Sequence, residues 1–582
     1  MMRILSRRLA LATVAASLVA SSMAIVGCDN SSGGPSSKPA GSTAGSTPQA
    51  DATARGRGNV MSFINRGDII TLDLNQMSYL QDFRVSYAIR EGLYKPNPKT
   101  LDAELCLATD VSTSPDGKAW TFKLRDDAQW SNGDAVTAKD FVFSWRNLLE
   151  AQGQYTYLLF YISGAKAYAE SYQKGEAASF DSVGIKTPDD YTIVITLDSP
   201  LTYLPDLLTF PTFYPRHEKS MAAFKLTDAK GRVSYDASYT QAKNVVTNGP
   251  FVMKEWSPGR QVVMTKSDTY RLKDKIKLDG ITMIVNNDPQ AAKVMYDAGE
   301  VDWVADVSPD IGFNAKKQGR SDLIVSDAFA TAYLTVNCGE NVPELSGKKN
   351  PLADIRVRQA LAMTIDRPTI VKSLTRMGEK IAERYVPSHF YKDWNSKTVP
   401  AYDVEAAKKL LAEAGFPDGQ GFPAISICYN GDSPARRDIS EYLRHQWKQH
   451  LNLDIESRQM ELKGYRDYIT SKQYTLGLAA WYGDYGDAST WTDKYAPESE
   501  NNDSNWAPQA YADLLAKAKI EPDASKRQQL LIDAESMINT ELPIIPIYHY
   551  VNFAFLRNDV KGLHLTSRNT TIWDDVSLER PK

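Results

Sequence analysis

Leu476–Asp487 (LGLAAWYGDYGD) brings together residue types that could bind a charged ligand. An apolar run ends in Trp481 and Tyr482, and Asp484 follows in a Gly-Asp-Tyr-Gly turn, with a second acid at Asp487. Aromatic faces supply contact area, glycine lets another backbone approach closely, and a carboxylate supplies one negative charge. On composition alone, the favoured interpretation is an edge strand that ends in a Gly-Asp turn. A ligand-binding role for this stretch therefore needs support from the rest of the chain.

The two acids of this stretch could instead be the paired carboxylates of a secreted hydrolase. Asp484 and Asp487 lie only three residues apart in a glycine turn, where they have no required geometry. The chain has no H-E-x-x-H zinc motif, no G-x-S-x-G elbow and no phosphate-binding glycine loop. Its four cysteines form no C-x-x-C pair and its six histidines are scattered. We therefore expect no enzyme activity, no cofactor and no metal site.

The N-terminus has the layout of an export signal. Three arginines within the first eight residues precede an apolar run over 9–26, and the sequence at 25–28, IVGC, resembles a bacterial lipobox. The following residues are mostly Ser, Gly, Thr, Ala and Pro, a composition typical of a flexible tether. We predict a signal peptide over 1–27, lipidation of Cys28 that anchors the chain to a bilayer, and a tether over 28–58. The protein would then lie on the periplasmic or cell-surface face of the cytoplasmic membrane.

Length and composition indicate a large globular protein. The 582 residues exceed one usual hydrophobic core, so two or three domains are expected. The hydrophobic content of 42% and the charged content of 24% are ordinary for a soluble fold. A formal net charge of −4 gives no electrostatic reason to expect a nucleic-acid partner.

Periodicity in the chain indicates a mixed α/β fold. Residues 60–64 have the character of a strand, and helical spacing is found over 82–93 and 138–150. Residues 280–303 follow the order strand, turn, helix, strand, which suits a mostly parallel sheet. Asp354 and Asp403 are each placed to cap the start of a helix.

Six passages together resemble a known family, the solute-binding proteins of bacterial peptide ABC transporters, of the oligopeptide- and dipeptide-binding type. They occur in the family's order and cover the chain from about residue 60 to its end. Each passage alone is weak evidence for the family, whereas the six together are highly specific for it. The passages are EGLYKPNP (91–98), SPDGKAWTFKLRDDAQWSNGDAVTAKDFVFSW (114–145), TNGPFVMKEW (247–256), PLADIRVRQALAMTIDRPTIV (351–371), YDVEAAKKLLAEAGFPDG (402–419) and the stretch at 476–487.

This resemblance implies an α/β fold of the periplasmic-binding-protein type, with two lobes joined by a hinge and an extra domain inserted beside the first lobe. By matching passages, the first lobe would comprise 59–104, 245–329 and 553–582. The extra domain would span 105–244 and the second lobe 330–552. Chain crossings near residues 330 and 552 would form the hinge, which closes around a ligand.

The resemblance also implies a site for short peptides. Asp484 matches the acid that binds the peptide's ammonium group, within the pattern W-x-x-D-Y. A protein that accepts many peptides should pair with the ligand main chain, as a strand does. Ala480, Trp481 and Tyr482 match the strand that does so from the second lobe, and Glu91, Gly92 and Leu93 match its counterpart on the first lobe.

Further contacts with the ligand are implied less directly. Asn501 matches a polar contact, and Asn502 is an alternative one residue away. Tyr155 and Tyr157 would cap the ligand from the extra domain, although packing at the surface would explain them equally well. The implied partners are short peptides, the subunits of a membrane ABC permease and, through Cys28, the bilayer; the protein itself would be a monomer.

One position departs from the family pattern. Some oligopeptide binders have an arginine six residues before the ammonium-binding acid, and here that position is Leu478. The ligand's carboxylate must then be bound elsewhere, with Arg376, Arg384 and Lys392 as candidates, or the site must tolerate different lengths. Two family roles other than peptide uptake remain open, namely binding of a different solute and reception of a peptide signal.

Overall fold

The computed structural model describes residues 58–580, except 152, 154, 177–178, 432–433, 498 and 500. They belong to the second of two compact units, Ala50–Lys582, and only that unit is described below. The predicted signal peptide, Cys28 and the predicted tether up to residue 57 lie outside the described residues. Within the described part, no helix is both long and apolar enough to cross a membrane.

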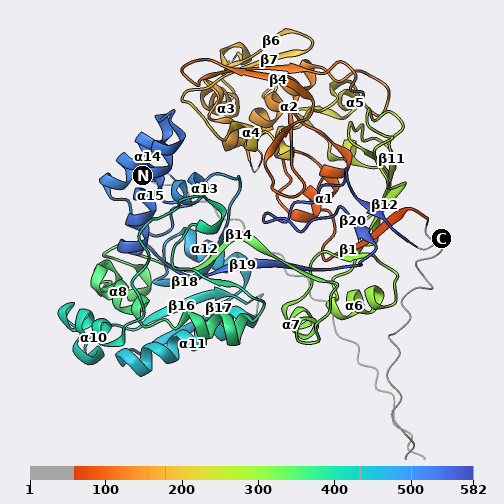
Figure 1. Cartoon of the computed structure of the whole chain (residues 1–582). Coiled ribbons are helices and arrows are strands. Elements are labelled where there is room, and N and C mark those ends of the chain that lie inside the picture. Colours follow the sequence, from red (N-terminus) through yellow and green to blue (C-terminus); the bar gives the residue numbers. More distant parts are fainter. Residues whose placement is uncertain are drawn as a thin grey trace, which may run out of the picture. The chain divides into compact units, whose positions relative to one another are not determined.

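The largest sheet has eleven strands in the order β10-β11-β12-β1-β13-β19-β14-β18-β16-β17, with β15 paired to β19 (Figure 1). We call β10, β11, β12, β1 and β13 the β1 half of this sheet, and β18, β16 and β17 its β18 half. The strands are β1 (Val60–Asn65), β10 (Phe251–Ser257), β11 (Gln261–Lys266), β12 (Gly280–Val285), β13 (Trp303–Val304), β14 (Leu323–Val336), β15 (Lys380–Ile381), β16 (Ile425–Asn430), β17 (Ile455–Met460), β18 (Leu476–Tyr482) and β19 (Ile544–Leu556).

Two long antiparallel strands, β14 and β19, join these halves. β13 pairs with the end of β19 at Phe555, whose partner on β14 is Leu323, and β18 pairs with β14 from Ala330 onward. β1 runs parallel to β13, and β18 runs parallel to β16. These registers make the carboxyl ends of β1 and β18 point toward each other across the middle of β14. Ligands in open α/β sheets bind beyond the carboxyl ends of the strands, so a site is expected there.

A second, four-stranded antiparallel sheet lies in the segment between β3 (Ala103–Leu105) and β10, with strand order β4-β5-β7-β6. It has its own hydrophobic core, which includes the fully buried Trp130, Phe141 and Trp145. Tyr485, which follows β18, also belongs to that core. The elements of this region are β4 (Ala108–Thr113), β5 (Ala119–Leu124), α2 (Ala138–Ala151), α3 (Ala165–Lys174), β6 (Ile185–Asp189), β7 (Thr192–Thr196), α4 (Leu204–Leu207), α5 (Glu218–Met221), β8 (Lys225–Thr227) and β9 (Val233–Tyr235).

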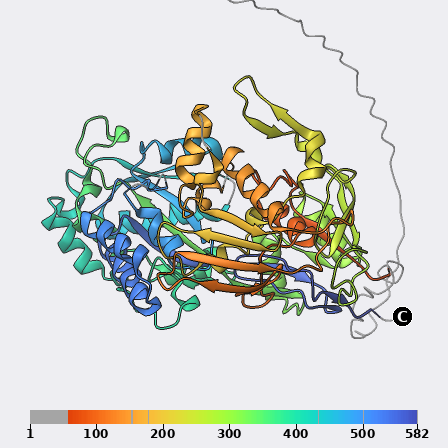
Figure 2. The same cartoon turned by 90° about the horizontal axis from the view of Figure 1, so that it is seen from above.

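Most remaining helices pack around the β18 half of the large sheet (Figure 1). Figure 2 shows them at one end. The last segment of the chain returns to β1, where Trp573 packs against Phe63. The helices are α1 (Leu80–Ile89), α6 (Pro289–Asp297), α7 (Pro309–Lys317), α8 (Ile355–Met363), α9 (Arg367–Thr369), α10 (Val404–Glu413), α11 (Pro434–Leu451), α12 (Leu462–Thr470), α13 (Ser489–Thr492), α14 (Gln509–Ile520) and α15 (Ala524–Glu541). Short strand pairs are β2 (Tyr94–Pro96) with β3 (Ala103–Leu105) and β20 (Val560–Lys561) with β21 (Ser577–Leu578).

Local signals in the chain predict several of these elements. The predicted strand at 60–64 is β1, the predicted helix at 138–150 is α2, and 280–303 forms β12, α6 and β13, with both strands parallel to β1. Asp354 and Asp403 cap α8 and α10 by accepting backbone N–H bonds. The prediction of a helix over 82–93 is wrong at its end, because α1 stops at Ile89.

The early end of α1 has a tertiary cause. Arg90 takes an extended conformation, and the Glu91 peptide group is then bound by the Asn248 side chain, which accepts from its N–H and donates to its C=O at 3.1 Å each. Asn248 is 157 residues away, so no pattern within the helix could have shown this contact.

Candidate ligand-binding site

A cavity of about 700 Å³ lies where the carboxyl ends of β1 and β18 face each other. This volume is within the range of small-molecule sites. Segments from both sheet halves, from the four-stranded-sheet region and from the last part of the chain contribute to its wall. The lining residues are Arg66, Gly67, Ser78, Tyr79, Leu80, Gln81, Phe83, Arg84, Tyr87, Tyr155, Phe210, Asp306, Phe329, Tyr482, Gly483, Asp484, Asn552, Ser567, Arg568, Asn569, Thr570 and Thr571.

Aromatic side chains form much of this wall. Phe210 is central, since its ring lies 4.9 Å from that of Phe83 and 4.8 Å from that of Tyr155, the latter edge to face. Such contacts hold rings in fixed orientations and add to the free energy of burial. The cavity therefore presents a rigid apolar surface against which ligand side chains of different types can pack.

Asp484 is the acidic residue that β18 delivers to this cavity. The preceding residue, Gly483, donates its N–H to the carbonyl of Phe329 at 2.9 Å, and the N–H of Asp484 donates to Thr490 Oγ1 at 3.1 Å. The turn is thus held by its backbone, which leaves the side chain available. Among the described residues, the carboxylate has one partner, the hydroxyl of Tyr157, which donates to Oδ2 at 3.5 Å.

The surroundings of Asp484 favour its uncharged form. Burial in the cavity wall raises the pKa of this carboxyl to about 6, and the hydrogen bond from Tyr157 acts in the opposite direction. An ammonium group that entered the cavity would supply the missing counter-charge and lower the pKa again. The geometry therefore suits a cationic ligand group.

The three residues before this turn lie on β18. Tyr482 lines the cavity and stacks on Tyr550, with ring centroids 5.6 Å apart. Trp481 is not among the lining residues; its Nε1 donates to the carbonyl of Thr490 at 2.8 Å, so it supports the turn. Ala480 pairs with β14 on one edge, whereas β16 covers the other edge of β18 only at Leu476 and Gly477. The strand therefore has an edge from 479 to 482 with no strand partner in the described part.

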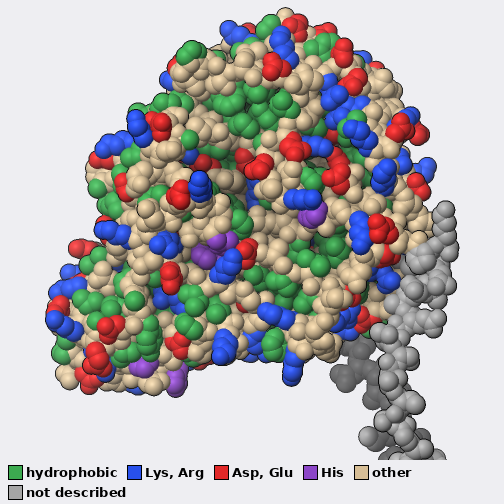
Figure 3. Space-filling model, in the orientation of Figure 1, with side chains coloured by type: hydrophobic (Ala, Val, Ile, Leu, Met, Phe, Trp, Pro, Cys, Tyr) green, Lys and Arg blue, Asp and Glu red, His purple; other side chains and the backbone are tan. Residues whose placement is uncertain are grey.

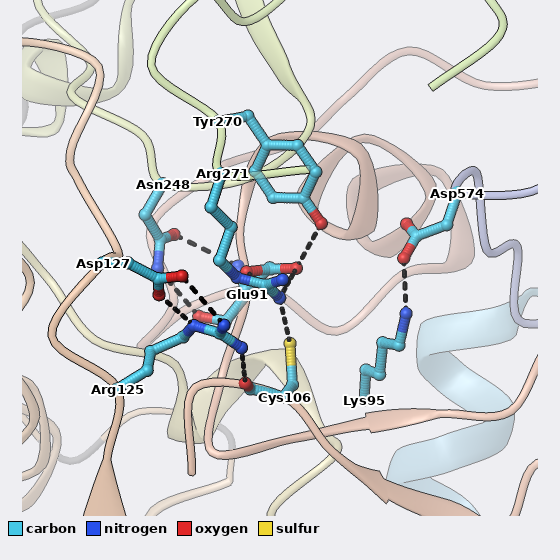
Figure 4. A network of polar contacts seen from close by, with 9 residues as sticks. All are labelled: Glu91, Lys95, Cys106, Arg125, Asp127, Asn248, Tyr270, Arg271 and Asp574. Carbon is cyan, nitrogen blue, oxygen red and sulfur yellow. Dashed lines mark hydrogen bonds and ion pairs between the residues drawn. The ribbon is translucent and has the colours of Figure 1, made fainter. Parts of the chain in front are cut away.

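Glu91, Gly92 and Leu93 do not line the cavity. Glu91 is buried and accepts hydrogen bonds from the Tyr270 hydroxyl at 2.5 Å and from Arg271 Nη2 at 3.1 Å (Figure 4). Backbone N–H groups of Leu107 and Cys106 donate to the carbonyls of Gly92 and Leu93. The resemblance implies that these three residues contact the ligand, but the structure places them at a junction of chain segments, where their polar groups already have protein partners.

In the structure, the two tyrosines predicted for the site lie at the cavity, whereas the two asparagines do not line it. Tyr155 lines the cavity, and Tyr157 reaches Asp484. Asn501 is exposed, away from the lining, and its carbonyl accepts from Lys494. Asn502 is buried, and its Nδ2 donates to the Tyr495 and Trp506 carbonyls, which is a structural role.

The candidates for the ligand's carboxylate also lie away from the cavity. Arg384 donates to the carbonyl of Ser396 at 2.8 Å, and Arg376 lies over the Phe313 ring. Leu478, which stands where some oligopeptide binders have an arginine, is buried in the core. Lys392 is likewise absent from the cavity lining. Three other arginines do line the cavity, and none of them is predicted from the sequence: Arg66, Arg84 and Arg568. The sequence offers a signal only for Arg66, which directly follows a strand.

Asp487, the second acid of the opening stretch, is not free. Arg527 donates to both of its carboxylate oxygens, at 2.7 and 2.8 Å, and the N–H of Ser489 donates to Oδ1. Hydrolysis by paired carboxylates therefore lacks its second group here. In the part of the chain described, no cluster of three or more His, Cys, Asp and Glu residues could hold a metal ion, and Cys106, Cys338 and Cys428 are free thiols.

Comparison with known proteins gives consistent results. The family described as "Bacterial extracellular solute-binding proteins, family 5 Middle" matches residues 103–503. The chain is 30% identical over 486 residues to the oligopeptide-binding protein OppA of Bacillus subtilis, which spans 81% of this chain and 84% of that relative. It is 27% identical over 520 residues to the periplasmic oligopeptide-binding protein OppA of Escherichia coli, spanning 86% and 88%.

Solved structures show the same fold. The murein tripeptide-binding protein MppA of Escherichia coli superposes with a TM-score of 0.72 at 25% identity, covering 91% of this chain and 99% of that one. A periplasmic oligopeptide-binding protein, OppAIV of Borrelia burgdorferi, gives a TM-score of 0.71 at 27% identity, covering 89% and 99%. These likenesses confirm the predicted two-lobed α/β fold of the periplasmic-binding-protein type.

Proposed function

This chain belongs to the bacterial extracellular solute-binding proteins of family 5, and from that premise we propose that it captures short peptides in its cavity and delivers them to a membrane ABC permease. The observation that carries the peptide assignment is Asp484, a cavity-wall carboxylate whose one partner among the described residues is a phenol at 3.5 Å. Every unmodified peptide has an ammonium group at its N-terminus, whatever its sequence, and that group is the natural partner of such a carboxylate.

The strength of this contact is enough to select for a free N-terminus. A hydrogen bond to a charged group contributes about 1.5–3 kcal/mol net. That corresponds to roughly tenfold to hundredfold in affinity. Blocking the ammonium by acetylation removes the charge and would leave Asp484 without a counter-ion.

The rest of the peptide would be held without regard to its sequence. The open edge of β18 from 479 to 482 offers backbone N–H and C=O groups to an extended ligand, as in strand addition. The aromatic wall around Phe210 accepts apolar side chains of different shape. Affinity would then come from groups that all peptides share.

Delivery requires a conformational change and a location at the membrane. We assign the first lobe to 59–104, 245–329 and 553–582, the extra domain to 105–244, and the second lobe to 330–552, with the hinge in β14 and β19. Closure of the lobes would enclose the peptide and present one surface to the permease. The export signal and lipidated Cys28 would hold a monomer at the outer face of the cytoplasmic membrane.

Calorimetric titration of synthetic peptides tests the proposal. Unmodified peptides of two to eight residues should bind and should raise the melting temperature by linkage, and their N-acetylated forms should bind about tenfold or more weakly. Asp484→Asn should erase this difference while the protein stays folded. Equal affinity for free and acetylated peptides would refute the role of Asp484. Mass spectrometry of material that co-purifies with the protein would show directly whether another solute is carried instead.

A further inference from the structure

Lys and Arg alternate with Asp and Glu on the face of the molecule shown in Figure 3, with no large area of one sign. Inside the molecule, by contrast, two arginines share one small cavity of about 20 Å³. Arg90 directly follows α1, and Arg216 lies two residues before α5. Both are buried, and neither lines the cavity that contains Asp484. The small cavity is therefore a separate feature, placed where α1 meets the segment that contains the four-stranded sheet.

The guanidinium group of Arg90 has only uncharged hydrogen-bond partners within the described part. Its Nη1 donates to the Ser86 hydroxyl at 3.3 Å, and its Nη2 donates to the Leu72 carbonyl at 3.0 Å. Burial lowers the pKa of Arg90 to about 10, and the nearby Arg216 charge acts in the same direction. A group with this pKa is still positively charged at neutral pH. This charge therefore lies in the interior with no carboxylate bound to it.

Arg216 adds a second positive charge and one carboxylate. Its Nη1 and Nη2 donate to the side-chain oxygens of Asn147 and Asn75, at 2.5 Å each, and both amides are neutral. The Asp73 carboxylate lies 3.5 Å from its Nη2 and is, among the described residues, the one acid at ion-pair distance from either arginine. No acidic residue of the described part lines the cavity itself. Two positive charges are thus offset by one negative charge.

The other ionisable groups around the cavity do not supply the missing negative charge. His217 lines it, and its Nδ1 accepts from the N–H of Ser220 at 3.2 Å, which leaves the proton on Nε2 for donation to Asp134 at 2.8 Å. Asp134 also pairs with Lys219 at 3.4 Å, so this group has no net charge. Burial raises the pKa of Asp140, an acid near His217 that does not line the cavity. The cavity therefore keeps an excess of positive charge.

Two hydrogen-bond donors of the lining have no partner among the described residues. They are Nε of Arg216 and the hydroxyl of Tyr239, residues that are 4% and 6% exposed. The Tyr239 hydroxyl is close to the Asp73 carboxylate but forms no hydrogen bond of normal geometry with it. Buried donors are almost always paired, because an unpaired donor loses its bonds to water without replacement. Two such donors at one positively charged cavity indicate that an anion is bound there.

We propose that this cavity binds a chloride ion, held by Arg90, Arg216 and Tyr239. A single water molecule needs a cavity of at least about 10–15 Å³. About 20 Å³ therefore accepts one monatomic ion and excludes phosphate, sulfate and carboxylate groups. Chloride accepts hydrogen bonds from several donors at once and supplies the missing negative charge. A water molecule would accept the hydrogen bonds but leave the excess charge uncompensated, which is costly in a buried site.

The bound ion would have a structural role. It fastens the end of α1, through Arg90, to the segment of the four-stranded sheet, through Arg216 and Tyr239. It stabilises the folded chain whether or not a peptide is bound, because the cavity shares no lining residue with the one that contains Asp484.

Anomalous diffraction tests the site directly. Bromide has the same charge as chloride and scatters anomalously, so it identifies halide sites. Crystals of the protein grown with sodium bromide in place of sodium chloride should show an anomalous peak between Arg90, Arg216 and Tyr239. Density for a water molecule alone at this place, without an anomalous peak, would overturn the assignment.

Thermal unfolding measures the same binding in solution. In about 150 mM sodium chloride the protein should melt about 2 °C higher than in sodium gluconate of equal ionic strength, because an ion that binds only the folded chain stabilises it. Gluconate is too large for the cavity. Tyr239→Phe keeps the ring and removes one donor to the ion, so the difference between the two salts should fall by roughly half or more.

Tyr296→Phe is the matched control. Tyr296 on α6 is also buried, and its hydroxyl also lacks a hydrogen-bond partner in the described part, but it does not line this cavity. This variant should keep the full difference between the two salts, even if its melting temperature is lower in both. Equal melting temperatures of the wild type in the two salts, or the full difference in Tyr239→Phe, would mean that the cavity binds no chloride.

Discussion

Asp484 and Glu91 are two acidic residues beside a glycine, each following a regular element of the large fold, and their surroundings are opposite. Glu91 accepts hydrogen bonds from Tyr270 and from Arg271, whose side chain is 7% exposed (Figure 4), and none of the three lines the cavity. Asp484 lies on the cavity wall, and among the described residues its carboxylate has a single partner, a phenol 3.5 Å away. The first arrangement stabilises the fold, and the second leaves a charge for a ligand to neutralise.

Burial raises the pKa of both carboxyl groups, but at Glu91 the Arg271 charge and the Tyr270 hydroxyl oppose the rise, whereas at Asp484 only the Tyr157 hydroxyl does. Because the folded-state pKa of Asp484 is raised from 3.8 to about 6, the ligand-free native state binds more protons than the unfolded chain between these values. Its contribution to the free energy of unfolding therefore decreases as pH rises through that range. At neutral pH the unliganded carboxylate costs stability, and bound ligand would restore it. An under-partnered charge of this kind is typical of a functional site.

The largest expected effect concerns Glu91, the acidic residue that stabilises the fold. Glu91→Gln removes the charge that faces buried Arg271, and breaking a buried ion pair in this way lowers the free energy of unfolding by about 3–5 kcal/mol. Urea denaturation measures this loss. Glu104→Gln, at an exposed glutamate of the same region, should change stability by less than about 0.5 kcal/mol. If Glu91→Gln kept wild-type stability but lost peptide binding, Glu91 would belong to the ligand site after all.

A smaller effect is expected in the turn that carries Asp484. An added Cβ at Gly483 would lie 2.0 Å from the Phe329 ring. Gly483→Ala must therefore shift the turn, which costs about 1–3 kcal/mol and moves the Asp484 carboxylate. Both the urea midpoint and the affinity for unmodified peptides should fall. Gly464→Ala on α12, where a Cβ meets nothing within 4 Å, is the matched control and should lower neither. Unchanged affinity in Gly483→Ala would mean that the turn does not position the ligand.

The smallest of the three effects is a dependence of affinity on pH. An ammonium ligand binds the ionised form of Asp484, whose pKa is raised to about 6, so binding below this pH requires loss of a proton. Affinity should then fall about tenfold for each pH unit below the pKa. Calorimetry between pH 4.5 and 7.5 measures the slope. Asp484→Asn should bind weakly and with no slope in this range, and a slope that survived in this variant would assign the titration to another group.

Several features follow from local sequence. Asp354 and Asp403 cap their helices because a short acidic side chain can reach N–H groups two or three residues ahead. The strand-turn character of Leu476–Asp487 is equally local, and it places Asp484 just beyond the end of β18. By contrast, the end of α1 was predicted four residues too late, because Asn248 binds the chain directly after it.

The sequence by itself determined the family, the two-lobed α/β fold and the acidic turn after β18, because these depend on short-range patterns and on passages that occur in a recognisable order. Only the tertiary structure decided which charges are neutral pairs. Arg271 meets Glu91 across 180 residues, Arg84 meets Asp306 across 222, and Arg568 meets Asp206 across 362. Such pairs are set by how strands and segments are brought together, and spacing along the chain carries no record of them. For that reason Glu91 is a structural residue in this fold, while Asp484 is left to face the cavity.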